Sequence, residues 1–120
     1  MAKVNVDAVP AGPELDALTA ERVFGWKEIH GEKHDPQGKR PDKLGRLRSA
    51  RVPDFSTDPT YAHEIEDRMK DLGLFEPYTK ELSRITRAKG VPTDWASPDQ
   101  RCRAAIKASR KRRQPPGATT

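Results

Sequence analysis

A chain of 120 residues holds one domain at most, and because charged residues (34%) match apolar residues (33%), its core must be small. The single cysteine excludes an intramolecular disulfide, and no apolar run reaches the length of a transmembrane helix. The net charge of +5 favours acidic partners, namely nucleic acid, a nucleotide or an acidic protein surface. We expect a cytoplasmic protein with no membrane partner. Whether it forms a homo-oligomer stays open, since a small core favours self-association.

The first third of the chain predicts an arm, a helix, a strand and a loop. Residues 1–12 contain a proline and a glycine and show no periodicity, so we expect a flexible N-terminal arm. A helix begins at Pro13, which suits a first helical turn, and ends near Gly25. Residues 26–29 are typical of a short strand. Residues 30–43 hold two prolines and two glycines and predict a mobile loop.

The middle of the chain predicts a second strand followed by the best supported helix. Residues 44–52 read as the strand. Thr57 or Asp58 can then cap a helix whose first turn contains Pro59. Apolar residues recur after it at intervals of three and four, which places them on one helical face until Gly73 ends the helix.

The last third leaves one segment undecided and predicts a final helix. Residues 74–95 fit either a helix that ends at Gly90 or a pair of short strands, and propensity alone does not choose between them. A helix starts cleanly after Ser97, because Gln100 lies where a capping box places it. Residues 110–120 begin with four basic residues and continue with two prolines, so we expect a basic disordered tail.

Three stretches in this order, residues 14–26, 52–58 and 97–106, together resemble the phage ABA sandwich domain, a family of small phage and prophage proteins. They cover about half of the chain. The resemblance implies an α+β sandwich of about three helices with a short antiparallel sheet, here a single domain over residues 13–109. It also implies a phage gene, expressed in an infected or lysogenic bacterial host. It implies no activity, because the family is defined by its fold.

Two arginine-rich clusters are the candidate binding residues. One lies on the second predicted strand and the other on the last helix and tail. Residues 101–113, which contain the second cluster, include no acidic residue. Arginine binds phosphate through two parallel hydrogen bonds, so these clusters predict contact with a polyanion. A solvated helix end is the alternative for the second cluster. The residues are Arg46, Arg48, Arg51, Arg103, Lys107, Arg110, Lys111, Arg112 and Arg113.

Other chemistry-bearing residues point to ordinary structural roles. His30 and His34 have a spacing that could hold zinc on a helix, but the glycine and proline around them favour a solvated loop. Cys102 falls on an apolar stripe and predicts a buried, inert thiol. The carboxylates Glu64 and Asp67 lie on a polar helical face, where ion pairing is the expected role. We also expect the large aromatic residues to be core, namely Trp26, Phe55, Tyr61 and Trp95.

No nucleophile–base pair, metal set or phosphate-binding loop is present in the sequence. We therefore expect that the protein is not an enzyme and that it has no catalytic residues, no metal site and no cofactor. The expected function is that of a small phage-encoded accessory protein that acts by binding. It would engage a phosphate-bearing ligand or acidic partner and antagonise a host defence or host factor. The alternative is a nucleic-acid-binding accessory protein that works through the basic C-terminal helix and tail.

Overall fold

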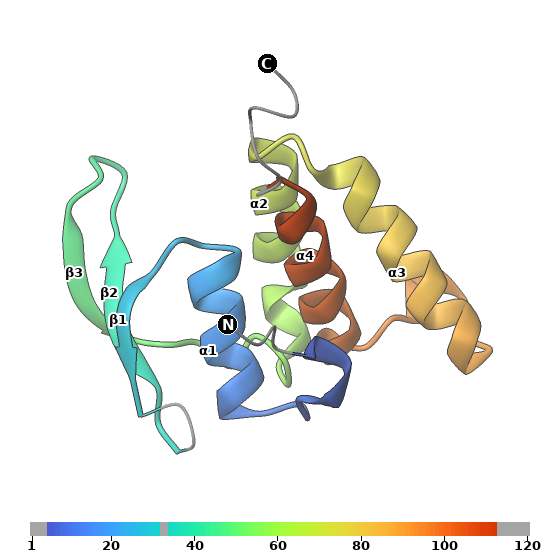
Figure 1. Ribbon diagram of the computed structural model, residues 1–120, viewed down its shortest axis with the longest axis horizontal. Helices are drawn as coiled ribbons and strands as arrows, with labels where there is room; N and C mark the ends of the chain where they lie inside the picture. The colour runs from blue at the N-terminus through green and yellow to red at the C-terminus, as the bar shows by residue number, and fades with distance from the viewer. Residues whose placement is uncertain (1–4, 32–33, 113–120) are drawn as a thin grey trace.

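The computed structural model describes residues 5–31 and 34–112, with side chains up to residue 110. Within these residues the chain forms four α-helices and one three-stranded antiparallel sheet, which confirms the expected α+β class. Figure 1 shows the helices gathered in one body, with the sheet standing beside it next to α1. The helices are α1 (Pro13–Arg22), α2 (Ala62–Asp71), α3 (Phe75–Lys89) and α4 (Pro98–Arg112), and the strands are β1 (Lys27–His30), β2 (Gln37–Pro41) and β3 (Leu47–Arg51).

Helix α4 is the centre of the helical body and packs against α1, α2 and α3. Its buried residues are mostly small, which lets the neighbouring helices approach closely. Cys102 is fully buried among them, as expected. The rest of the buried α4 side chains are Ala104, Ala105, Ile106, Ala108 and Ser109.

The undecided segment 74–95 is a helix and not a pair of strands. Tyr78 and Leu82 bury one face of α3, and Gly90 ends it in a left-handed conformation with φ of 73°. A short 3-10 helix, η3 (Thr93–Trp95), then leads into α4. It turns Trp95 outward with 74% of its surface exposed, so the expectation that Trp95 belongs to the core is wrong. Three-residue turns of this kind leave no periodic signal in a sequence.

The starts of α2 and α4 use caps close to the expected ones. Asp58 accepts the amide N–H of Thr60 at 3.0 Å and caps η2 (Pro59–Tyr61), from which α2 continues. At α4 only half of the expected capping box forms. The Gln100 side chain accepts the N–H of Ser97 at 2.9 Å, whereas the Ser97 hydroxyl donates to Asp99 at 2.5 Å.

The N-terminal segment contributes to the core. We expected residues 1–12 to be a flexible arm; residues 1–4 lie outside the described part of the chain. Residues 5–12 include the short 3-10 helix η1 (Val6–Ala8), which contacts α4, and both Val6 and Val9 are buried. The ordered domain therefore begins before Pro13. At the other end, α4 continues to Arg112, so the first residues of the expected tail are helical.

The sheet has the strand order β1-β2-β3, with both pairs antiparallel. Both expected strands are present, but the third, β2, occupies residues expected to be loop, because a strand of Gln, Gly, Lys, Arg and Pro carries no apolar signal. Gly38 and Ala50 form a cross-strand pair on the face that packs against the core. Buried Trp26 and Val52 fasten the two ends of the sheet to the helices.

Candidate functional site

The structure places the two predicted basic clusters on different elements and uses two residues of the one on α4, Arg103 and Lys107, internally. Arg103 donates through Nη2 to the carbonyl oxygen of Val9 at 3.0 Å and pairs with Asp99 one turn earlier on the helix. Lys107 donates to Asp7 at 2.9 Å. Both basic side chains are largely covered, with 15% and 22% of their surface exposed. These two residues therefore fasten the N-terminal segment to α4.

The rest of that cluster extends past the described side chains. Arg110 is half-buried in the last turns of α4. The backbone of Lys111 and Arg112 is helical, but their side chains, and the whole of Arg113, lie outside the described residues. The structure thus places no exposed cluster on the described part of α4.

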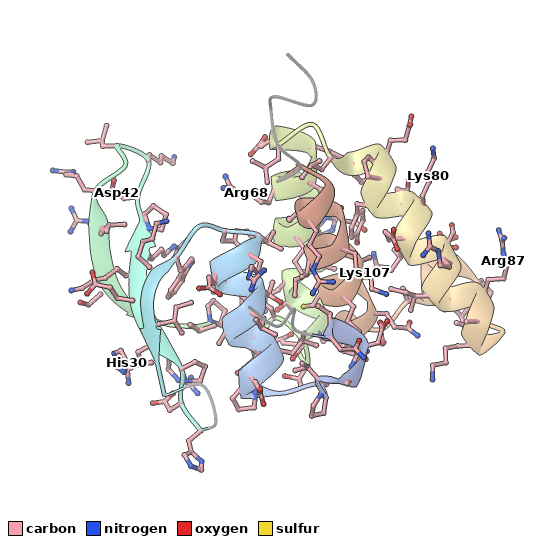
Figure 2. All side chains as sticks on the ribbon, viewed as in Figure 1. His30, Asp42, Arg68, Lys80, Arg87 and Lys107 are labelled. Carbon is pink, nitrogen blue, oxygen red and sulfur yellow. The ribbon has the colours of Figure 1, made fainter. Side chains whose placement is uncertain are left out.

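The cluster on β3 is exposed, in contrast. Arg46 and Arg48 each pair through Nε with the Oδ2 atom of Asp42, at 3.3 and 3.2 Å. The other oxygen of Asp42 accepts the backbone N–H groups of Leu44 and Arg46, both at 2.9 Å, so this carboxylate shapes the β2–β3 turn. The amide N–H of Arg46, with further help from the two arginines, holds the pKa of Asp42 below its ordinary value. Figure 2 shows Asp42 near the hairpin end of the sheet.

Arg51 lies at the other end of β3 and is held in the same way. Its Nε donates to Asp35 at 2.5 Å, and this bond holds the pKa of Asp35 below its ordinary value. The guanidinium remains 65% exposed. The contacts described for Arg46, Arg48 and Arg51 all use Nε, which leaves their Nη amino groups for another acceptor.

Charge is segregated between the sheet and the helices. Residues 27–51 contain eight Lys or Arg and four Asp or Glu, a net charge of +4. Residues 1–26 carry −2 and residues 52–109 carry −1, while residues 110–120 carry the remaining +4. The helical body, which includes Arg110, Lys111 and Arg112 at the end of α4, is therefore close to neutral, and the sheet forms a basic surface beside it. We call Arg46, Arg48 and Arg51, with Lys39 of β2, the basic sheet surface; because side chains alternate along a strand, Lys39 and Arg51 lie on one face of the sheet and Arg48 on the other.

The sheet face that points away from the core is hollowed. Lys39 and Ser49 form a cross-strand pair on this face, and the Lys39 ammonium donates to the Ser49 hydroxyl at 2.8 Å. The hollow measures about 150 Å³. Sites for whole drug-sized molecules measure about 300–1,000 Å³, so this one suits a single phosphate or carboxylate group. It is lined by Glu28, His30, Gln37, Gly38, Lys39, Ser49 and Ala50.

A β-bulge in β1 produces this hollow. Lys27 pairs with Lys39 and His30 pairs with Gln37, so two residues of β1 face the single residue Gly38 of β2. Glu28, in the bulge, has a φ of 53°, which is uncommon for a residue other than glycine. A Cβ at position 38 would lie 2.9 Å from Cγ1 of Ile29, so only glycine fits under the bulge. The bulge turns Glu28 and His30 into the hollow.

Two polar networks, one buried and one part-buried, were not predicted from the sequence. In the first, the amide and the hydroxyl of Ser56 donate to the same oxygen of Asp16, at 2.7 and 2.6 Å. The Ser56 hydroxyl also accepts the N–H of Gly12 at 2.8 Å. Burial raises the pKa of Asp16 above its ordinary value, and the bonds from Ser56 oppose that shift only in part. The network fastens the segment after β3, which contains Ser56, to the first turn of α1.

The second network joins three helices. Arg101 of α4 donates to Oε2 of Glu66 on α2 at 2.5 Å, and the hydroxyl of Tyr78 on α3 donates to the same oxygen at 3.0 Å. Burial, followed by the charge of Glu66, raises the pKa of Tyr78. The sequence marks Glu66 only as one acid on a polar helical face, so its buried partner could not be named from periodicity. Both networks are structural.

The remaining candidate residues do not form a reactive centre. His30 and His34 are exposed, and the described residues hold no group of three metal-ligating side chains in reach of one ion. Burial raises the pKa of the Cys102 thiol to about 12, which fits an inert thiol. No helix in the described part of the chain combines the length and hydropathy needed to cross a membrane.

Comparisons with protein-family models, curated proteins and solved structures find no significant match to this chain. The resemblance to the phage ABA sandwich domain thus stays a prediction, and the candidate site rests on the geometry of the sheet.

Proposed function

We propose that this chain is a non-enzymatic binding protein whose basic sheet surface engages a phosphate-bearing ligand or an acidic partner. The observation that carries the proposal is the uneven distribution of charge: a segment of +4 forms a sheet beside a helical body that is close to neutral. A surface of one sign raises the local concentration of ligands of the opposite sign and speeds their association.

The way in which the sheet arginines are held supports the same function. Their pairs with Asp42 and Asp35 are exposed, and exposed ion pairs contribute only about 0–1 kcal/mol. These carboxylates orient the guanidinium groups without satisfying them, because the Nη atoms are not part of the pairs. An incoming phosphate or carboxylate can therefore accept two parallel hydrogen bonds from a preoriented group.

The hollow between Lys39 and Ser49 adds a place for one anionic group. At about 150 Å³ it is smaller than a site for a whole drug-sized molecule and suits a single anionic group. Most of the ligand would thus lie on the open surface of the sheet, and binding would depend on charge more than on burial. Such binding weakens as salt rises, because exposed charges are screened.

The test is a titration with inorganic tripolyphosphate, measured by calorimetry at low salt. The variant Arg46→Gln/Arg48→Gln/Arg51→Gln removes three charges from the sheet. The matched control removes three exposed basic residues from α3, on the opposite side of the helical body: Lys80→Gln/Arg84→Gln/Arg87→Gln. We expect the sheet variant to lose at least about tenfold in affinity and the control to lose less than about twofold. Equal losses in both variants, or no binding by the unaltered protein, would overturn the proposal.

A second function, nucleic-acid binding through the end of α4 and the residues after it, is favoured by four consecutive basic residues, 110–113. It predicts that removing residues 110–120 abolishes binding to a random-sequence DNA duplex. The affinity of the full chain should fall at least about tenfold between about 50 and 200 mM salt. Unchanged DNA binding by the shortened chain would exclude this function and leave the sheet as the anion site.

A further inference from the structure

Strand β3 has a free edge whose backbone groups can be assigned from the ladder. The N–H of Val52 donates to Pro36 at 2.9 Å, and the N–H of Asp42 donates to Arg46 at 2.8 Å, so these two pairs are hydrogen-bonded. Hydrogen-bonded and non-bonded pairs alternate along an antiparallel ladder. The residues between them that face β2 are therefore Arg48 and Ala50.

Leu47, Ser49 and Arg51 consequently point their N–H and C=O groups away from β2. β3 is the last strand of the sheet, and no other described strand pairs with it. The edge thus presents three donors and three acceptors in the spacing that another strand needs. Pro41 fits this register, because it lies opposite Leu47 in a non-bonded pair that does not need its missing N–H.

This edge lacks most of the features by which proteins prevent strand addition. β3 contains no proline, its five pairs with β2 run in register without a bulge, and no described helix lies against it. Its only protection is charge, from Arg46, Arg48 and Arg51. Two copies of β3 brought together would place six guanidinium groups side by side, so charge disfavours self-pairing. The same charges attract an acidic strand.

Exposed apolar residues add a second contact at the hairpin end of this edge. Leu44 is 75% exposed and Leu47 is 47% exposed, and together they are two of the four large apolar side chains that are exposed in the described part of the chain. A strand added to β3 would run about 4.8 Å away, within reach of the arginine side chains. It would match this edge best with an apolar residue beside Leu47 and acidic residues beside Arg48 and Arg51.

We propose that the free edge of β3 accepts an extended acidic segment of another protein as a fourth strand. The inference rests on the proposed function, because it specifies the partner that the basic sheet surface engages. Backbone hydrogen bonds would supply the register, and the arginines would select acidic side chains, as in other complexes formed by strand addition.

The experiment uses a synthetic probe, a capped peptide of about nine residues whose sequence places valine beside Leu47 and glutamate beside Arg48 and Arg51. A control peptide has the same sequence with N-methyl groups on the amides that would face β3, so its charge is unchanged and its pairing is blocked. Amide hydrogen exchange of the isotope-labelled full chain is followed by NMR. We expect the unmodified peptide to slow exchange of the Leu47, Ser49 and Arg51 amides at least about tenfold. The amides of Arg48 and Ala50, already bonded to β2, should change little.

The outcomes separate this inference from the proposed function. If both peptides bind equally well, or binding leaves the three amides unprotected, recognition is by charge alone and the edge inference fails while the proposed function stands. If tripolyphosphate binds and neither peptide does, the edge inference also fails. If no anion binds, both fail.

A pair of chain variants gives an independent check on the same edge. Ser49→Pro removes an outward N–H that the ladder does not use, and Ser49→Ala keeps it. Loss of peptide binding in the proline variant alone supports the inference, and equal binding by the two overturns it. The N-methylated peptide decides the matter if the proline variant disturbs the sheet.

Discussion

The buried carboxylate of Asp16 yields the sharpest prediction about stability. Asp16 and Ser56 are 3% and 1% exposed, and one carboxylate oxygen accepts both the amide and the hydroxyl of Ser56. In the variant Asp16→Ala the hydroxyl can still donate to Gly12, whose carbonyl oxygen is 3.2 Å away, but the Ser56 amide has no such substitute. An unsatisfied buried amide costs about 1–3 kcal/mol, so we expect the free energy of unfolding to fall by about 2 kcal/mol.

Asp16→Asn should behave differently, because the asparagine oxygen can accept the same two bonds without a buried charge. We expect its free energy of unfolding at neutral pH to lie within about 1 kcal/mol of the unaltered protein. The two variants differ only in whether an acceptor remains, so a similar loss in both would contradict the assignment of the bond as the stabilising contact.

The pH dependence follows from the raised pKa of Asp16, which burial causes. The folded protein binds this proton more tightly than the unfolded chain, so the stabilisation that Asp16 contributes is fully present below its ordinary pKa of 3.8. This stabilisation is lost as pH rises through the raised pKa of Asp16, and no further change is expected at higher pH. Asp16→Asn lacks this group, so its stability relative to the unaltered protein should increase with pH across that window and then level off.

Urea unfolding of the two proteins, followed by circular dichroism from about pH 3 to pH 8, measures this difference. The variant Glu14→Gln removes an exposed acid from the same helical turn and serves as the control, with an expected change within about 0.5 kcal/mol. If the free energy of unfolding of Asp16→Asn, relative to that of the unaltered protein, instead falls with rising pH, the fold favours the charged form of Asp16. The reasoning from burial would then be refuted.

Three further predictions concern the sheet, the thiol and the helix junction. Gly38→Ala places a Cβ 2.9 Å from Cγ1 of Ile29 and should lower the free energy of unfolding by about 1–3 kcal/mol in urea titrations; an unchanged midpoint would show that the bulge can shift. Cys102, with a thiol pKa raised to about 12, should react with a thiol reagent at pH 8 only as fast as the protein unfolds, and rapid labelling would show local opening. A double-mutant cycle of Glu66→Gln and Arg101→Met should give a coupling energy of about 1–2 kcal/mol, and additive losses would contradict a shared network.

Periodicity and capping explain why most of the helical part of the fold could be predicted. The boundaries of α1 and α2 follow from Pro13, Asp58 and the glycine after each helix, which act within one turn of the chain. Strand β2 could not be predicted, because its residues pair in a half-exposed sheet where no apolar alternation is needed. The expectation that Trp95 belongs to the core rests on its size alone, whereas the local turn geometry leaves its side chain exposed.

The basic residues also differ in how far along the chain their partners lie. The N-terminal partners of Arg103 and Lys107 lie 94 and 100 residues away in the chain, so no pattern near α4 could reveal that these two residues fasten the N-terminal segment. The partners of the β3 arginines are between 4 and 16 residues away, in the same sheet.

That difference determines which basic residues can bind a ligand. Arg103 and Lys107 are more than three-quarters covered, so recruiting them to a ligand would break contacts that hold residues 5–12 on the core. Arg48 and Arg51 are 67% and 65% exposed, and exposed pairs such as theirs contribute about 0–1 kcal/mol. An anion can therefore bind the Nη groups of these arginines, which the pairs with Asp42 and Asp35 do not use, with little effect on folding. Substitutions on β3 should consequently change binding more than stability, whereas substitutions of Arg103 should change stability first.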